Sequence, residues 1–178
     1  MRNFNFSAKG FTVIELVVGL IIFAILALTI LQRLVSLEND AKAAVLAEVA
    51  GAMKDSLQLI NAKAISTGKA DGEQTISYNN VDLKLYNGYP LIDGSSSFTE
   101  INEQVSAWLD IDIVDRNTAR NAHDAARFFS DKWSARNRMY IFFSEDYEQK
   151  SVNFQCQVMY ENQIDGEGFR VEVLDSAC

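Results

Sequence analysis

The chain has 178 residues, which is enough for one domain of ordinary size together with a long helix. Apolar residues make up 48% of the sequence and there is one proline, so the composition argues against a disordered chain. The formal net charge is −8. A surface of this charge repels nucleic acid, and we therefore expect no bulk binding of DNA or RNA.

One apolar stretch, residues 11–31, dominates the N-terminal part of the chain. It reads FTVIELVVGLIIFAILALTIL, and Glu15 is its only ionisable side chain. About 20 apolar residues in a helix span roughly 30 Å, which is the thickness of a bilayer core. A lone carboxylate at that depth costs on the order of 2.5–3.5 kcal/mol, so Glu15 needs a partner.

Two ordinary interpretations of this stretch are a signal peptide and a plain membrane anchor. A signal peptide has a shorter apolar region followed by a small-residue cleavage site, and residues 28–33 offer no good site of this kind. A plain anchor has the right length but leaves Glu15 without a role.

Residues 9–16, KGFTVIEL, resemble the processing site of type IV prepilins, in which a glycine precedes phenylalanine and a glutamate follows four residues later. The resemblance implies that a membrane peptidase cuts between Gly10 and Phe11 and that the new terminus, Phe11, becomes N-methylated. It also implies that Thr12 and Glu15 act in assembly. The freed amine of Phe11 on one copy would pair with Glu15 of a neighbour.

The resemblance divides the chain into three parts. Residues 1–10 are a cleaved leader, residues 11–31 form a transmembrane and filament-core helix, and residues 32–178 form a globular head that includes the amphipathic half of the helix. Arg2 and Lys9 precede the apolar run, while Glu38 and Asp40 follow it. This charge bias places the leader in the cytoplasm and the rest outside. We therefore expect a single-pass inner-membrane protein with its head in the periplasm, and an extracellular pilus after assembly.

The helical pattern continues beyond the apolar run, because residues 32–67 contain no proline and only Gly51 as a weak helix former. Gly68 is a natural end, so the whole helix would be about 85 Å long. Many type IV pilins carry a glycine and a proline in this helix, and Ala24 and Gln32 stand at the corresponding positions here. We therefore expect a more continuous helix. Its apolar positions at helical spacing are Leu34, Leu37, Ala41, Ala44, Val45, Ala52, Met53, Leu59 and Ile60.

After Gly68 the pattern changes to short segments. Residues 75–78 and 81–86 are predicted strands joined by an Asn79-Asn80 turn, and residues 98–110 are a predicted helix capped by Ser97 or Thr99. Residues 112–133 are ambiguous. Three strands then follow at 139–144, 152–160 and 169–174, with short connections that favour an antiparallel meander. The predicted fold class is α+β: a long N-terminal helix packed on a C-terminal antiparallel sheet, as in type IV pilins.

Cys156 and Cys178 are the only cysteines, and both lie on the oxidising side of the membrane. A bridge between them would close a loop of about 22 residues and contribute around 3 kcal/mol. Nothing basic adjoins either residue, so a reactive thiol pair is disfavoured. A C-terminal region bounded by a disulfide is also typical of type IV pilins. Together with the NGYP loop at 87–90, it resembles the mannose-sensitive haemagglutinin pilins.

Other candidate sites are weaker. His123 is the sole histidine, and no nucleophile-elbow pattern surrounds any serine, so we expect a solvated loop histidine and no catalytic site. Asp110, Asp112 and Asp115 form the densest acidic cluster but lack the glycine and alternate spacing of a calcium loop. The sequence at 165–167, DGE, reads as a turn. Some pseudopilins bind calcium in such loops, and this alternative stays open for either site.

We interpret the chain as a structural subunit of a type IV pilus-like filament, not an enzyme, and we expect no cofactor and no metal. Its expected partners are other copies of itself, related pilins, the prepilin peptidase, the inner membrane before assembly and the pilus assembly machinery. The alternatives are a pseudopilin of a type II secretion system and a membrane-anchored periplasmic binding or enzymatic domain.

Overall fold

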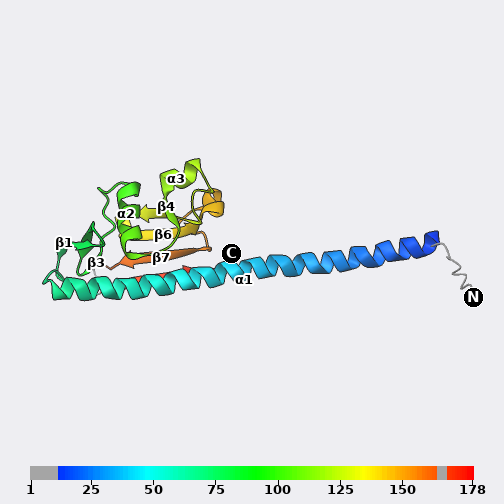
Figure 1. Cartoon of the computed structure of the whole chain (residues 1–178), viewed down its shortest axis with the longest axis horizontal. Coiled ribbons are helices and arrows are strands. Elements are labelled where there is room, and N and C mark those ends of the chain that lie inside the picture. The colour runs from blue at the N-terminus through cyan, green and yellow to red at the C-terminus, as the bar shows by residue number, and fades with distance from the viewer. Residues whose placement is uncertain (1–11, 164–167) are drawn as a thin grey trace, which may run out of the picture. The chain divides into compact units, whose positions relative to one another are not determined.

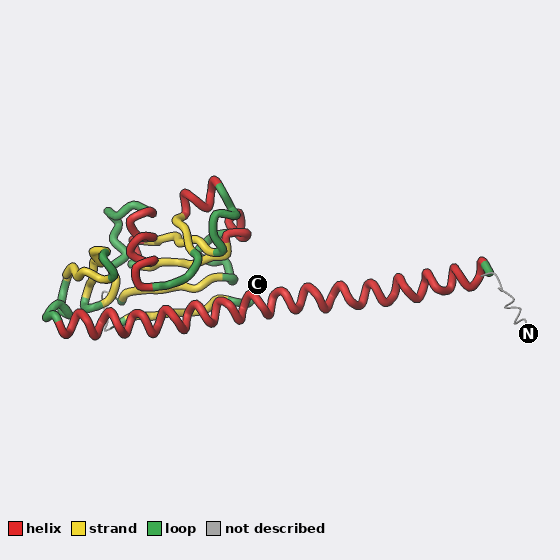
Figure 2. The backbone as a smooth tube through the Cα atoms, viewed as in Figure 1, coloured by secondary structure: helices red, strands yellow, loops and turns green. Residues whose placement is uncertain are grey.

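The computed structural model describes residues 12–163 and 168–178. Helix α1, Val13–Ser66, comprises 54 residues and continues through both Gly19 and Gly51 (Figure 2). The expectation of a continuous helix is confirmed over this range. The helix ends where Gly68 adopts a φ of 69°, a left-handed conformation that suits glycine, and donates its N–H to the Ile65 carbonyl at 3.0 Å.

The chain divides into two compact units, Met1–Asp40 and Ala41–Cys178. The first unit contains the apolar N-terminal part of α1. The second contains the rest of α1 and all the strands. The predicted boundary between residues 31 and 32 lies inside the first unit and stays a prediction.

Within the second unit, α1 buries one face at a spacing of three and four residues. Met53 and Ile60 lie on this face, as the periodicity predicted. Leu59 does not: it is 61% exposed, because the buried stripe is narrower than the apolar pattern of the sequence. The buried residues of this face are Leu46, Val49, Ala50, Met53, Leu57, Ile60 and Ala64.

A three-stranded sheet follows α1 and contains the predicted hairpin. Strands β1, Glu73–Tyr78, and β2, Val81–Tyr86, pair antiparallel, and the short β3, Tyr89–Pro90, adds to β2. Asn79 and Asn80 form the turn with φ values of 48° and 66°, the positive angles that a two-residue hairpin requires. The hairpin prediction is confirmed, whereas β3 was not predicted.

The larger sheet has five strands in sequential order, β4-β5-β6-β7-β8. All neighbours pair antiparallel except β4 and β5, which are parallel. Figure 1 shows these strands running alongside the part of α1 that belongs to the second unit. The strands are β4 Ile113–Asp115, β5 Phe128–Trp133, β6 Arg138–Phe143, β7 Gln157–Asn162 and β8 Phe169–Leu174, and the helices around them are α2 Phe98–Trp108, α3 Arg116–Asn121 and the 3-10 turns η1 Ser134–Arg136 and η2 Ser144–Gln149.

The α+β prediction is confirmed, with one difference in the sheet: the parallel β4–β5 pair is not part of an antiparallel meander. The predicted helix over 98–110 is present, and Ser97 caps it in a reciprocal capping box with Glu100. The strand predicted at 152–160 begins only at Gln157. Strand β5 was missed, because it lies in the ambiguous segment.

A buried polar network joins the two sheets. The Asn162 side-chain amide donates to the carbonyls of Tyr86 and Tyr89 at 3.0 Å and of Pro90 at 3.2 Å. The Tyr160 hydroxyl donates to the Pro90 carbonyl at 2.7 Å, and burial raises the pKa of this phenol well above its usual value. Since Asn162 and Tyr160 are buried, these bonds satisfy backbone carbonyls that water does not reach.

Candidate functional site

The N-terminal end of α1 is organised by Thr12 and Glu15. The Thr12 hydroxyl oxygen accepts the Glu15 backbone N–H at 3.3 Å, and the Thr12 backbone N–H donates to the Glu15 carboxylate at 3.5 Å. This reciprocal pair is a capping box, which satisfies backbone donors in the first turn of a helix. The sequence T-x-x-E at 12–15 carries the signal for this capping box, which was not predicted.

Residues Val13–Ile30 form an 18-residue helical segment with a mean hydropathy of 2.9, long and apolar enough to cross a membrane by length and composition. None of its side chains is buried within the chain. A fully buried Leu, Ile, Val or Phe side chain contributes about 1.5–3 kcal/mol relative to an exposed one. An uncovered run of this kind is therefore strongly unfavourable in water, and lipid or other protein has to cover it.

The predicted cleavage and methylation residues, Gly10 and Phe11, lie outside the described residues. The described part of the chain thus begins at Thr12, one residue after the predicted new terminus, and α1 begins at Val13. Thr12 and Glu15 are brought together within one chain, whereas the predicted pairing of Glu15 with Phe11 of a neighbour stays a prediction.

Cys156 and Cys178 form a disulfide, with their Cα atoms 4.8 Å apart and a sequence separation of 22 residues. Cys156 is buried directly before β7, and Cys178 packs against the same core. The Ala177 backbone N–H donates to the Gln155 carbonyl at 2.9 Å. The bridge and this hydrogen bond hold the last residues against the sheet, where a chain end would otherwise fray.

The acidic cluster has local structural roles. Asp115 is the N-cap of α3, and its carboxylate accepts the backbone N–H groups of Asn117 and Thr118 at 2.9 and 3.3 Å. Asp112 accepts the Arg127 backbone N–H at 2.8 Å, and Asp110 is exposed. Within residues 12–163 and 168–178, no three His, Cys, Asp or Glu side chains come together as a metal site. Residues 165–167 lie outside the described part of the chain.

His123 is exposed and contacts the Tyr147 ring edge-on, with ring centroids 5.3 Å apart. Its imidazole forms no hydrogen bond to any side chain that the structure describes. The contact is a packing interaction between the two rings.

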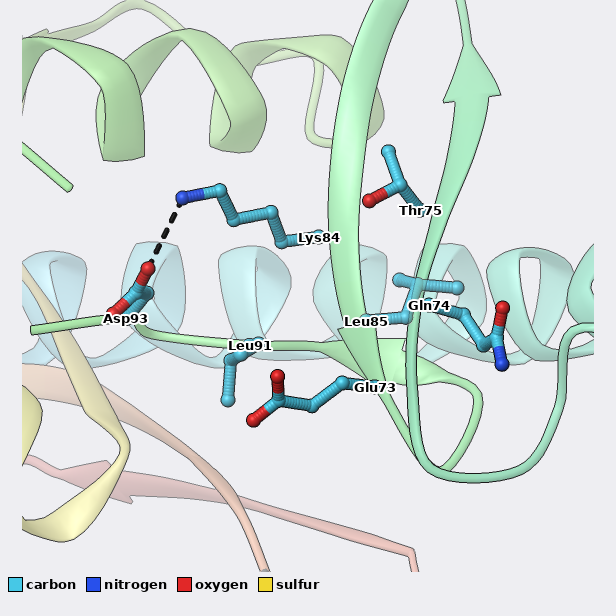
Figure 3. A pocket seen from close by; sticks show the side chains of 7 residues that line it. All are labelled: Glu73, Gln74, Thr75, Lys84, Leu85, Leu91 and Asp93. Atoms are coloured by element: carbon cyan, nitrogen blue, oxygen red, sulfur yellow. Dashed lines mark hydrogen bonds and ion pairs between the residues drawn. The ribbon is translucent and has the colours of Figure 1, made fainter. Parts of the chain in front are cut away.

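A cleft of about 430 Å³ lies beside the hairpin, and its lining includes Lys84 and Asp93. Figure 3 shows the Lys84 side chain pointing at the Asp93 carboxylate, with the two groups 3.0 Å apart. The Ser95 hydroxyl and backbone N–H, and then Lys84, hold the pKa of Asp93 well below its usual value. Since Lys84 and Asp93 pair with each other, neither of these two charges is left for a ligand.

A second group of polar side chains was missed by sequence reasoning. Arg116 and Arg120 on α3 and Lys150 after η2 line a common cleft of about 540 Å³. No local motif joins residues 34 positions apart, so only the folded chain brings them together.

Comparison with known proteins identifies the N-terminal part of the chain. Residues 5–31 match the family described as the prokaryotic N-terminal methylation motif. The chain therefore carries a type IV pilin-like prepilin signal, which belongs to a structural class of protein and not to an enzyme family. No curated protein and no solved structure matches the chain.

Proposed function

We propose that the chain is a structural subunit of a type IV pilus-like filament, made as a prepilin and processed before assembly. The observation that carries the proposal is that the matched motif and an uncovered apolar helix overlap in the sequence. The methylation motif at 5–31 covers the start of α1, and the apolar helix inside that motif, Val13–Ile30, buries none of its side chains within the chain. A processing signal at the start of an apolar helix that the chain itself leaves uncovered supports a subunit whose helix is covered by lipid or by other copies.

Processing precedes assembly in this account. A prepilin peptidase cuts between Gly10 and Phe11, and Phe11 becomes the N-methylated terminus. The apolar helix and the motif fit membrane anchoring before assembly. The Cys156–Cys178 disulfide supports a head on the oxidising side of the inner membrane, because such bridges persist in that compartment.

Assembly then transfers the apolar run of α1 from lipid into a core made of the same helices of other copies and related pilins. The exchange replaces one apolar environment with another, so packing alone gives little preference for one axial stagger. Glu15 supplies the preference by pairing with the Phe11 amine of a neighbour, because an unpaired charge in that core is strongly unfavourable. Thr12 holds the Glu15 carboxylate at the helix end where the neighbour's amine would reach it.

Processing is tested with the substitution Gly10→Glu, which places a charged side chain at the cut. We expect an intact mass that begins at Met1 and no filaments. The matched control, Ser7→Glu, adds the same charge inside the leader and should be processed normally, giving a chain that begins at methylated Phe11. A wild-type chain that keeps Met1, or a Gly10→Glu chain that is cut like the wild type, would contradict the proposal.

The methylation motif is shared by pilins and by pseudopilins of type II secretion systems, which build a short periplasmic fibre. Shearing cells separates these two: a pilin subunit appears in the sheared extracellular fraction, while a pseudopilin stays with the cells. A membrane-anchored binding or enzymatic domain instead predicts monomers after extraction in detergent.

A further inference from the structure

The cleft between α3 and η2 is rich in cations, although the chain as a whole is acidic with a net charge of −8. It holds Arg116, Arg120 and Lys150 against the single carboxylate Glu148, and Asn117 adds an exposed amide. The local charge is therefore opposite to that of the whole chain. Such a local reversal attracts an anion to this cleft while the rest of the surface repels it.

The fold neutralises the cations of this cleft only in part, through Asp131, which pairs with Arg116 and interacts electrostatically with Lys150. Within the part of the chain that the structure describes, no carboxylate lies within 4 Å of the charged groups of Arg120 or Lys150, and only Arg116 has an ion pair, at 3.4 Å from Asp131. Arg116 and Arg120 are four residues apart on one short helix, a spacing at which like charges destabilise the helix. An anion seated between them would relieve this repulsion.

Two of the three cations are held in place. The Lys150 ammonium lies over the Tyr147 ring, 3.5 Å from its centroid, and the Arg116 guanidinium lies 5.1 Å from the centroid of Phe98. Cations fixed in this way lose little freedom when a ligand binds.

A second cavity of about 290 Å³ shares Arg116 with the cationic cleft. It lies against β5 and β6, and three consecutive residues of β5, Asp131, Lys132 and Trp133, belong to its lining. Trp133 and Val152 are 37% and 43% exposed, so this cavity presents an open apolar wall. Burial raises the pKa of Asp131, and its carboxylate is a hydrogen-bond acceptor beside that wall.

We propose that the two cavities form one binding site for an acidic saccharide, with a carboxylate or sulfate group at Arg116, Arg120 and Lys150 and the sugar ring against Trp133 and Val152. Charge-assisted hydrogen bonds to arginine suit planar and tetrahedral oxyanions. The carboxylates of Asp131 and Glu148 accept hydroxyl donors, which a saccharide has in abundance.

The mixed lining favours a saccharide over the other polyanions. A DNA strand places a phosphate at every nucleotide and has no free hydroxyl along its backbone to donate to Asp131 and Glu148, so these two acceptors oppose it. An extended peptide commonly adds to a free strand edge. β5 pairs with β6 along its length but with β4 only over Phe128–Ser130, so a peptide strand is the competing occupant at Asp131 and Trp133, and the peptide probe below tests it. Each ring of an acidic sugar carries an anion together with several hydroxyls, so it offers a group for the cations and donors for the two carboxylates. The inference does not require the filament, because every residue of the site belongs to one head.

The test measures binding to the full mature chain in detergent micelles. The probes are an oligogalacturonate, a sulfated chondroitin oligosaccharide, a neutral galactan oligosaccharide of equal length, a single-stranded oligothymidine and an oligoglutamate peptide. The variants are Arg120→Gln and Lys150→Gln in the cationic cleft and Trp133→Ala and Val152→Glu in the apolar cavity. Lys54→Gln is the matched control, since Lys54 is an exposed lysine of α1 and its loss changes the net charge by the same amount.

We expect saturable binding of at least one acidic saccharide, with the neutral one about tenfold weaker or worse. Arg120→Gln and Lys150→Gln should each raise the Kd about tenfold, and so should Trp133→Ala. If Trp133→Ala unfolds the head, Val152→Glu takes its place with the same expected effect. Lys54→Gln should leave the Kd unchanged. The inference is overturned by the absence of saturable saccharide binding, by tighter binding of the oligothymidine or the peptide, or by an equal effect of Lys54→Gln. None of these results bears on leader processing or filament yield, so failure here is distinguishable from failure of the proposed function.

Discussion

Substituting Glu15 by glutamine separates the two roles that the structure and the proposal give to this side chain. Within one chain, Glu15 belongs to the capping box with Thr12. Between chains, the proposal pairs its charge with the Phe11 amine of a neighbour. Glutamine retains the capping hydrogen bond, because the capping box accepts Glu or Gln, but it has no charge. Alanine removes both.

The two roles differ in size. The Thr12 N–H to Glu15 carboxylate distance is 3.5 Å, at the outer limit of a hydrogen bond, so its loss should cost less than about 1 kcal/mol. Loss of one partner of a buried ion pair costs about 3–5 kcal/mol, which corresponds to roughly a 100- to 4,000-fold weaker association. Glu15→Gln should therefore reduce assembly nearly as strongly as Glu15→Ala.

The assay compares subunit in the sheared filament fraction with subunit in the membrane fraction, by quantitative immunoblot, for wild type, Glu15→Gln, Glu15→Ala and Thr12→Ala. Intact mass confirms that each chain is cut and methylated at Phe11. Thr12→Ala is the matched control, since it removes the capping hydroxyl but keeps the acid, and a lost cap costs about 1 kcal/mol, or roughly fivefold. Filament yield from Glu15→Gln equal to wild type would refute the ion-pair role and leave Glu15 as a helix cap.

Three further predictions concern the head, whose unfolding is followed by tryptophan fluorescence, since both tryptophans lie in the second unit. Cys178→Ser should lower the free energy of unfolding by about 3 kcal/mol, and a reductant should then have no further effect, whereas an equal response of wild type and variant to reductant would exclude the bridge. Asn162→Ala should cost about 2–3 kcal/mol because it leaves buried carbonyls without their donor, against about 1 kcal/mol for Tyr160→Phe, and a smaller loss for Asn162→Ala would show that the network is not a major contributor. The depressed pKa of Asp93 contributes stability that is present above its unfolded pKa of about 4 and is lost as pH falls toward its folded value, so Asp93→Asn should destabilise the head at pH 7 and much less at pH 2; a pH-independent difference would contradict this.

Local signals predicted the elements that depend on neighbouring residues. The absence of proline predicted α1, the Asn79-Asn80 pair predicted the hairpin, and Ser97 predicted the start of α2. In each case the determining residues lie within one turn or one helix, so their chemistry acts before any distant part of the chain is in place.

Elements that depend on distant partners were not predictable in this way. Strand β5 reads FFSDKW and shows no alternation of apolar and polar residues, because the neighbouring Phe128 and Phe129 are both buried, each in a different hydrophobic cluster. Its parallel partner β4 is only three residues long and is separated from β5 by α3. Asp115 looked like a possible metal ligand in sequence, and only its hydrogen bonds show that it caps α3.

The same distinction holds for the candidate sites. The N-terminal site is contiguous, and its pattern of glycine, phenylalanine and glutamate was visible in residues 9–16 and agrees with the matched motif at 5–31. The cationic cleft joins α3 to the residue after η2, and nothing in the local sequence around Arg120 or Lys150 indicates that they share a cavity.

The most direct test of the central claim is the distance between the Phe11 amine of one copy and the Glu15 carboxylate of another inside assembled filaments. Filaments are grown from an equal mixture of subunits, half carrying ¹⁵N-phenylalanine and half ¹³C-glutamate, so that any ¹⁵N–¹³C dipolar coupling at the amine arises between copies. The account predicts a coupling that corresponds to an ion pair, with nitrogen and oxygen within about 4 Å. A filament that shows this coupling only when both labels are on the same chain, and none in the mixture, would contradict it.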